Sequence, residues 1–265
     1  MTTTSTLDVS ATPAIPFMRL FRVELRKTVD TRAGRWLVGI TIGAALIAEG
    51  IFLAVAATHN DVTAAYGDFV GAAAFVSSIL LPVVGIMLVT SEWSQRTAMT
   101  TFSLEPRRMR IVTAKLLAGV TLTAFVIAFA LVVGLVCNVL YGVLQSHQTT
   151  DWTFGWSGFG GFVINQTFAM LGGFALACLL LNTPAAIVVF FIYKWVLPGL
   201  FALGAALMAW FNSIVDWIDF QSAQNELYEM PLTGSQWGHL AVSGVIWLVI
   251  PLAIGIWRIR RAEVK

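Results

Sequence analysis

The basic residues of this chain are gathered into three short stretches, and the chain between them is almost entirely apolar. The sequence holds sixteen lysines and arginines, and all but Lys194 lie in residues 19–35, 96–115 and 258–265. The other polar connections carry acids and no bases: Asp61 and Asp68, Asp151, and Asp216, Asp219, Glu226 and Glu229. Such a charge bias is typical of a membrane protein whose basic loops face the cytoplasm. The pattern therefore predicts membrane spans and their orientation together.

The composition excludes an ordinary soluble enzyme. Hydrophobic residues make up 58% of the 265 residues and charged residues only 11%, whereas soluble domains carry about 25% charged residues. The net charge of +2 is too small to indicate a nucleic-acid partner. Cys137 and Cys178 both lie in apolar runs, so we expect neither a disulfide framework nor a metal site. Membrane lipid is the expected partner of most of the surface, and the plasma membrane is the expected location.

Six apolar runs are long enough to cross a bilayer, which takes about 20 helical residues. They are residues 36–57, 69–90, 111–140, 162–181, 184–211 and 239–257. The predicted fold class is therefore an all-α polytopic membrane protein with six transmembrane helices. An even number of spans places both termini on one side, and the basic residues near both make that side cytoplasmic. Residues 1–14 are expected to be a disordered cytosolic tail, and residues 258–265 a basic one.

The fifth run is too long for one straight crossing. At 1.5 Å per residue, its roughly 28 residues would reach about 42 Å, against a hydrocarbon core of about 30 Å. Pro198 and Gly199 lie inside it and predict a break near residue 198. The following segment, Asn212–Phe220, mixes apolar residues with two acids, and the connection 145–161 mixes aromatic residues with glycines. Both are expected to lie at the outer membrane interface.

Two cytoplasmic elements follow from the basic stretches. Residues 15–35 are predicted to form an amphipathic helix on the inner leaflet, or equally a plain anchor without a further role. In residues 91–110, Pro106 disfavours helix at Glu105 and can begin the next helix. A short helix over about Glu92–Thr101, with Phe102 exposed beside it, would suit docking to a cytosolic partner. The alternative is a solvated loop whose bases only set the topology.

These residues resemble a known family. Phe21-Arg22-Val23-Glu24-Leu25-Arg26-Lys27 directly precedes the first span. The loop between the second and third spans has an acid followed by Arg-Thr, and then Leu104-Glu105-Pro106-Arg107-Arg108. With six spans and a broken fifth, the chain resembles a permease subunit of the type-2 family of ATP-binding cassette (ABC-2) transporters over almost its whole length. Arg96 stands where that family commonly has Gly.

The resemblance implies an exporter of an apolar or amphipathic substrate. Two permeases, identical or different, would pair, and each would dock a separate cytosolic subunit that binds ATP and Mg²⁺. This chain holds no GxxxxGK[ST] loop, so we expect it to bind no cofactor and to be no enzyme. The helix 15–35 and the loop 91–110 would be the family's connecting and coupling elements. The expected docking residues are Glu92, Arg96, Thr97, Thr100, Phe102, Glu105, Arg107 and Arg108, followed by Glu24, Arg26 and Lys27.

Glu49 and Lys194 are the ionisable residues expected deepest in the spans. Both spans run outwards and place them at similar depth, where an unpaired charge costs from about 2.5 to over 10 kcal/mol. We expect them to form an ion pair along the substrate pathway or to contact substrate, with Phe190 and Tyr193 lining the same path. Alternatively, Lys194 reaches for the interface, Glu49 is neutral and packed, and the aromatic residues fill the core or face lipid.

Other functions remain open at this point. An intramembrane protease is disfavoured, because no span holds an Asp and all three histidines lie at outer ends. A self-contained secondary carrier using Glu49 and Lys194, or the membrane subunit of an importer, is the alternative to an exporter. A purely structural membrane protein is the third possibility.

Overall fold

The computed structural model describes residues 15–59, 62–95, 97–145, 150–229 and 231–261. Among them every regular element is helical, and the one β-type contact is an isolated bridge between Ala65 and Asp151. The elements are α1 Phe17–Asp30, α2 Arg32–Thr58, α3 Tyr66–Ser94, α4 Ala98–Leu104, α5 Arg108–Leu144, α6 Gly155–Leu180, α7 Thr183–Phe191, η1 Ile192–Val196, α8 Leu197–Leu207, α9 Ala209–Asn212, α10 Val215–Ile218, α11 Phe220–Asn225, η2 Glu226–Glu229, α12 Gly234–Gly244, η3 Val245–Val249 and α13 Ile250–Arg261.

Six helical segments of the described chain are long and apolar enough to cross a membrane, as predicted. They are Arg32–Thr58, Tyr66–Ser94, Arg108–Leu144, Ser157–Leu180, Thr183–Leu207 and Gly234–Arg261. Most extend beyond the predicted runs, because apolar composition marks only the part of a helix that lies in hydrocarbon. The chain therefore has the character of a multi-pass helical membrane protein.

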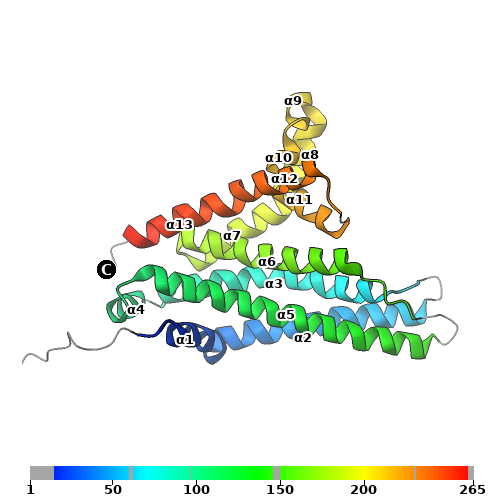
Figure 1. The fold of residues 1–265 in the computed structure, drawn as a ribbon, viewed down its shortest axis with the longest axis horizontal. Helices are drawn as coiled ribbons and strands as arrows, with labels where there is room; N and C mark the ends of the chain where they lie inside the picture. The colour runs from blue at the N-terminus through cyan, green and yellow to red at the C-terminus, as the bar shows by residue number, and fades with distance from the viewer. Residues whose placement is uncertain (1–14, 60–61, 96, 146–149, 230, 262–265) are drawn as a thin grey trace, which may run out of the picture.

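Four long helices, α2, α3, α5 and α6, run side by side along the molecule, and α3 lies between the others (Figure 1). A Cβ added to Gly85 of α3 would lie 2.5 Å from the Met170 carbonyl oxygen of α6. Gly173 of α6 meets the Pro82 carbonyl of α3 just as closely. The two helices can approach this far only because both positions are glycine.

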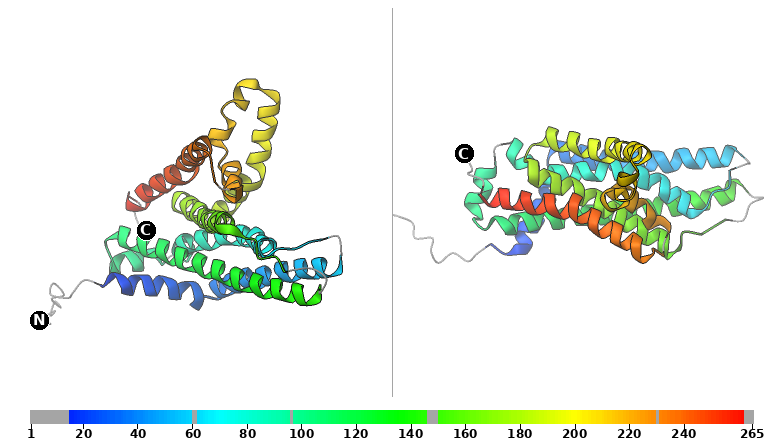
Figure 2. Two further views of the ribbon diagram at one scale, coloured as in Figure 1. Left: turned by 45° about the vertical axis from the view of Figure 1, so that its right-hand side comes forward. Right: turned by 90° about the horizontal axis from the view of Figure 1, so that it is seen from above.

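The second part of the chain departs from this bundle. The segments α7–η1–α8 and α12–η3–α13 diverge from it, and α8 and α9 project away from it (Figures 1 and 2). The short elements α10, α11 and η2 link the two segments, and η2 packs on α6. The expected single helix over Asn212–Phe220 is instead divided among α9, α10 and α11.

The fifth and sixth spans each contain a π-helical segment. η1 ends two residues before Pro198, and η3 ends two residues before Pro251. A proline has no N–H and its ring crowds the carbonyl four residues earlier, so the turn before it cannot keep regular α-helical hydrogen bonds. The predicted break near residue 198 therefore takes the form of a widened turn. The helix then ends at Leu207 rather than 211, because Met208 is extended.

Two other boundaries differ from expectation. The helix predicted over 15–35 is interrupted at Thr31, whose hydroxyl accepts a hydrogen bond from the Gly34 N–H at 3.1 Å and caps α2. The connection predicted over 145–161 is shorter, because α6 already begins at Gly155. Gly161 lets α6 approach the Leu227 carbonyl of η2, so this glycine serves packing rather than a loop.

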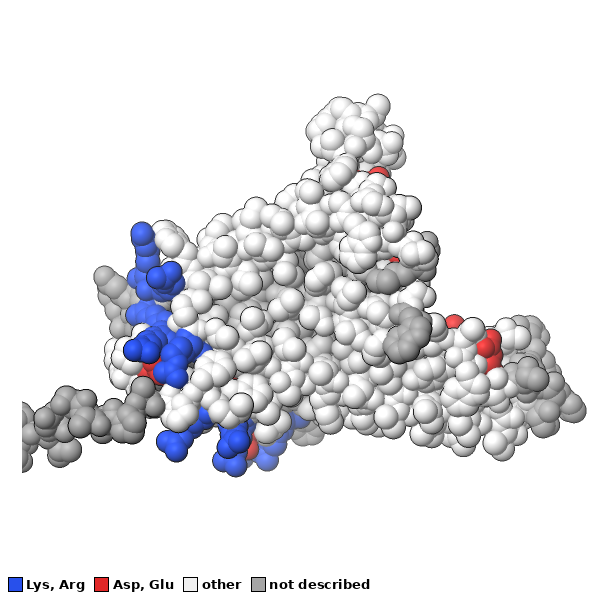
Figure 3. Space-filling model, in the orientation of Figure 1, with Lys and Arg blue, Asp and Glu red and all other residues white. Residues whose placement is uncertain are grey.

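Apart from Lys194, the described basic residues gather at one end of the molecule, called here the basic end: they lie in α1, the first turn of α2, the start of α5 and the last turn of α13, and α4 lies among them (Figure 3). Acidic residues appear at the opposite end in the same view. Arg258–Arg261 belong to α13 rather than to a separate tail. The expected tail 1–14, Arg96 and residues 262–265 lie outside the described residues.

Candidate functional site

The loop between α3 and α5 folds into the short helix α4. Its bounds are Ala98–Leu104 rather than the expected 92–101, because Glu92 still belongs to α3. The Thr97 N–H donates to the Glu92 carbonyl at 2.9 Å, which turns the chain directly back onto the end of α3. Glu105 is extended, as expected of a residue before proline, and ends α4.

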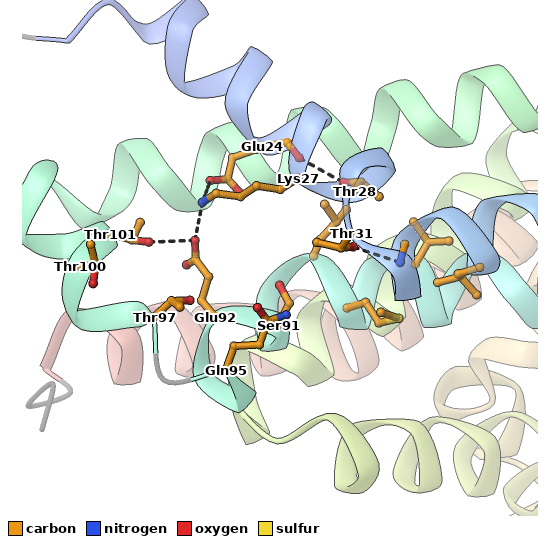
Figure 4. A pocket seen from close by; sticks show the side chains of 15 residues that line it. Glu24, Lys27, Thr28, Thr31, Ser91, Glu92, Gln95, Thr97, Thr100 and Thr101 are labelled. Atoms are coloured by element: carbon orange, nitrogen blue, oxygen red, sulfur yellow. Dashed lines mark hydrogen bonds and ion pairs between the residues drawn. The ribbon is translucent and has the colours of Figure 1, made fainter.

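A buried cluster of four charged residues lies at the basic end and joins α1, α3 and α5. Lys115 Nζ lies 2.7 Å from a Glu24 oxygen and 3.3 Å from a Glu92 oxygen. Lys27 Nζ contacts the same two carboxylates at 2.8 and 2.7 Å. The Thr101 hydroxyl donates to Glu92 at 3.1 Å and adds α4 to the set (Figure 4). We call these five residues the basic-end cluster.

The cluster pairs two acids with two bases, and three of these four residues are shielded from water. Glu24, Glu92 and Lys115 are buried, whereas the Lys27 side chain is 42% exposed. Burial lowers the pKa of Lys27, but its hydrogen bonds to Glu24 and Glu92 outweigh this and leave the pKa above its ordinary value. Removing one partner of a buried ion pair is far more costly than removing an exposed one, because the other charge stays buried and unpaired.

A cavity of about 320 Å³ opens beside the cluster, between α1, α2, α3 and α4 (Figure 4). Glu24, Lys27 and Glu92 line its polar side, and apolar residues such as Leu37 and Leu88 line its floor. The cluster therefore borders a cavity that separates part of α4 from α1.

A second set of contacts ties the turn between α4 and α5 to both ends of the chain. Arg110 pairs with Glu105 at 2.5 Å and donates to the Ile15 carbonyl at 2.6 Å. Arg108 donates to the Ile259 carbonyl at 2.6 Å and lies over the Phe102 ring, 4.9 Å from its centroid. The turn thus holds the start of α1 and the end of α13 together.

The described members of the expected docking set are buried, half-buried or exposed, and the half-buried ones are Lys27, Phe102 and Arg108. Glu24, Glu92 and Glu105 are buried in ion pairs within the chain, so they do not form a free surface. Phe102 was expected to be exposed, but it is half-buried, with its ring centroid 6.2 Å from that of Trp93. The exposed members are Arg26, Thr97, Thr100 and Arg107.

Sequence reasoning missed three residues here. Met99 and Leu104 of α4 are 50% and 70% exposed and add apolar side chains to its outer face. Lys115 was counted among the bases that set topology and in the loop pattern of the family resemblance, but not as a site residue, although it lies in the third span and is buried at the centre of the cluster. Its position inside an apolar run was the signal, because ionisable residues in spans are usually functional.

The expected pairing of Glu49 with Lys194 is wrong. Glu49 is fully buried in α2, and neither carboxylate oxygen has a hydrogen-bond partner among the described residues. Lys194 lies in η1, which does not pack on α2. Phe190 is buried in the core, and Tyr193 packs on Trp247 of η3 with centroids 4.9 Å apart. Lys194 lines a cavity of about 520 Å³.

No known protein family model matches this chain, and no curated protein matches it either. The arrangement at the basic end must therefore be interpreted from its own geometry. Across the described residues, no three His, Cys, Asp or Glu side chains are grouped to hold a metal ion. The site consists of an exposed short helix, α4, which is connected by a hydrogen bond to buried ion pairs between three longer helices.

Proposed function

We propose that this chain is a permease subunit of an ATP-binding cassette exporter of the type-2 family. It would move an apolar or amphipathic substrate across the plasma membrane, while a separate cytosolic subunit hydrolyses ATP. The observation that carries the proposal is the basic-end cluster. Through Glu92, Lys115 and Glu24 it links α4 to α3, α5 and α1, so a force on the exposed short helix reaches two spans directly.

The proposed mechanism needs no chemistry from this chain. ATP and Mg²⁺ bind to the cytosolic subunits, and their closure moves α4 of each of two paired permeases. Thr101 and Glu92 transmit that movement to α3, and Lys115 transmits it to α5. In this mechanism the cavity beside the cluster would take up the shift of α4, while α3 would stay packed on α6. Nucleotide then biases two arrangements of the spans, one open inwards and one open outwards.

The outer face of α4 is the proposed docking surface. Met99 and Leu104 are exposed there, Thr100 is exposed where α4 borders the cavity, and the exposed Arg107 follows in the turn. Exposed apolar side chains beside an arginine are more typical of a surface that binds another protein than of one that contacts only water. The buried Glu24, Glu92 and Glu105 would support this surface from within rather than contact the partner.

Affinity purification from native membranes in mild detergent, with mass spectrometry of what co-elutes, tests the proposal. The wild-type chain should retain a stoichiometric ATP-binding subunit, and Thr100→Glu with Leu104→Glu should lose it. The matched control is Thr58→Glu with Leu144→Glu, which changes an exposed Thr and an exposed Leu at the opposite end. Loss of the partner from both variants would instead indicate general unfolding and contradict a docking role for α4.

One observation favours a second candidate, a self-contained carrier or an importer subunit. Glu49 is buried without a hydrogen-bond partner among the described residues, and such a group is expensive in a span unless it has a function. Recovery of the chain alone, under conditions that preserve other membrane complexes, would favour this alternative.

A further inference from the structure

A second cavity, of about 520 Å³, lies in the half of the molecule away from the basic end. Its walls come from the first turns of α3, from α6, from η1 and from the α11–η2 segment that folds back over α6. It shares no residue with the cavity at the basic end. Its lining combines residues of three candidate membrane spans with residues of the α11–η2 connection, and none of them belongs to α1 or α4.

Two polar side chains in this cavity lack partners. Lys194 Nζ has no hydrogen-bond or ion-pair partner in the described chain, and its nearest recorded contact is the Trp195 ring, 5.9 Å away. Asn165 of α6 is only 9% exposed, and within the described residues no hydrogen bond is formed by its side chain. Both line the cavity, and none of its lining residues is acidic.

The backbone holds Lys194 in this position. It is the central residue of the π-helical segment η1 and stands four residues before Pro198, where the proline ring disfavours regular helix. Neighbouring Tyr193 does not line the cavity and packs on Trp247 instead, with ring centroids 4.9 Å apart. π-helical turns in membrane and soluble helices often mark functional positions. Here the widened turn presents a cation to a cavity rather than to lipid.

The cavity has a polar wall and an apolar edge. Besides Lys194 and Asn165, the polar wall includes Asn225 and Tyr228. On the other side, Phe75 and Trp195 pack edge to face with centroids 6.2 Å apart, and both side chains are exposed. A ligand with a charged head and an apolar tail could place its head on the polar wall and its tail along these rings.

The unpaired positive charge of Lys194 indicates which head group the cavity can bind. An uncompensated ammonium among spans is costly, and an anion would satisfy it. The ammonium offers three donors, and Asn165, Asn225 and Tyr228 add more, which exceeds what the two oxygens of a carboxylate accept. We propose that this cavity binds the phosphate head group of an amphipathic molecule through Lys194 and Asn165. That this molecule is the exported substrate rests on the proposed function; the binding itself does not.

Native mass spectrometry of the purified full chain in detergent tests the binding without any ATPase. The probes are dioctanoyl phosphatidic acid, dioctanoylglycerol with the same chains but no phosphate, and inorganic phosphate. Phosphatidic acid should bind best. Lys194→Gln should weaken it by about tenfold or more, since a charged hydrogen bond is lost, and Asn165→Ala should weaken it less. Lys194→Arg should retain most of the binding because the charge stays.

The control variant is Arg260→Gln, which removes one exposed positive charge at the basic end and should leave binding unchanged. Equal binding of dioctanoylglycerol, or equal affinity in Lys194→Gln and wild type, would overturn the inference. Equal binding of inorganic phosphate would show a free-anion site and overturn the head-group assignment. If Lys194→Gln does not fold, the comparison of Asn165→Ala with wild type decides the result.

The two proposals fail separately. If phosphatidic acid binds through Lys194 but no ATP-binding subunit co-purifies, the cavity assignment stands and the exporter does not. If the ATP-binding subunit co-purifies but Lys194→Gln binds phosphatidic acid as tightly as wild type does, the exporter proposal is supported. This cavity is then not the substrate site of the exporter.

Discussion

Lys115 is the residue on which the basic-end cluster depends most, because its ammonium alone is buried between both carboxylates. Replacing it by Met should leave Glu24 and Glu92 sharing one half-exposed lysine and lower the stability by roughly 3–5 kcal/mol. Lys27→Met should cost less, because the Lys27 side chain is 42% exposed and water screens the loss. Thermal unfolding of both variants in one detergent is the measurement. Equal losses would contradict a dominant role for Lys115.

The raised pKa of Lys27 predicts an alkaline effect on stability. A group whose pKa is higher in the folded chain contributes stability that is complete below its unfolded pKa of 10.5 and is lost as the pH rises through the folded value. The difference in melting temperature between wild type and Lys27→Met should therefore be constant near neutral pH and narrow above about pH 10.5. Melting curves in one detergent from pH 7 to 11 measure it. A difference that narrows already at neutral pH would contradict the ion-pair explanation.

At the scale of single residues, the sequence identified the charged residues but not the side chains that they contact in the fold. Residue counting along the spans predicts a similar depth for Glu49 and Lys194. Depth does not say which helices are adjacent, and η1 does not pack on α2, so the predicted pair does not form. Conversely, Glu24, Glu92 and Lys115 are distant in sequence and meet only because α1, α3 and α5 converge at the basic end.

At the scale of elements, close packing of α3 on α6 depends on glycines. Gly173→Ala would place a methyl group against the Pro82 backbone, which cannot yield as a flexible side chain would. It should destabilise the protein by about 1–3 kcal/mol. Gly39→Ala in α2 is the control, because a Cβ there meets nothing within 4 Å, and it should be neutral or slightly stabilising. Chemical or thermal unfolding of both variants measures their stabilities. Equal stabilities would contradict the conclusion that Gly173 is needed for the close packing of α3 on α6.

Element existence was predictable, whereas element ends and irregularities were not. The six spans follow from length and apolar composition alone. Pro198 predicted the break in the fifth span. Pro251 could have predicted the π-helical segment of the sixth span in the same way, but no break was predicted there. The glycines before residue 162 suggested a loop, because a sequence does not show that Leu227 will approach Gly161. Such contacts depend on the tertiary fold.

For the whole molecule, the separation of charge between the two ends predicts the orientation in the membrane. Cytoplasmic loops retain lysine and arginine, so the basic end should face the cytoplasm. Thr100 of α4 and Thr58 at the end of α2 are both exposed threonines at opposite ends, and each can carry a single cysteine once Cys137 and Cys178 are replaced by Ser. In intact cells, a membrane-impermeant maleimide should label Thr58→Cys only. Thr100→Cys should react after the membrane is opened.

This orientation is also a condition for the proposed function, because ATP is available only on the cytoplasmic side. If Thr100→Cys reacts in intact cells, α4 faces outwards and cannot dock a cytosolic ATPase, whatever its packing. If only Thr58→Cys reacts, α4 and the basic-end cluster lie in the compartment that holds ATP. The cavity at Lys194 then belongs to the outer half of the membrane, on the side to which an exporter releases its substrate.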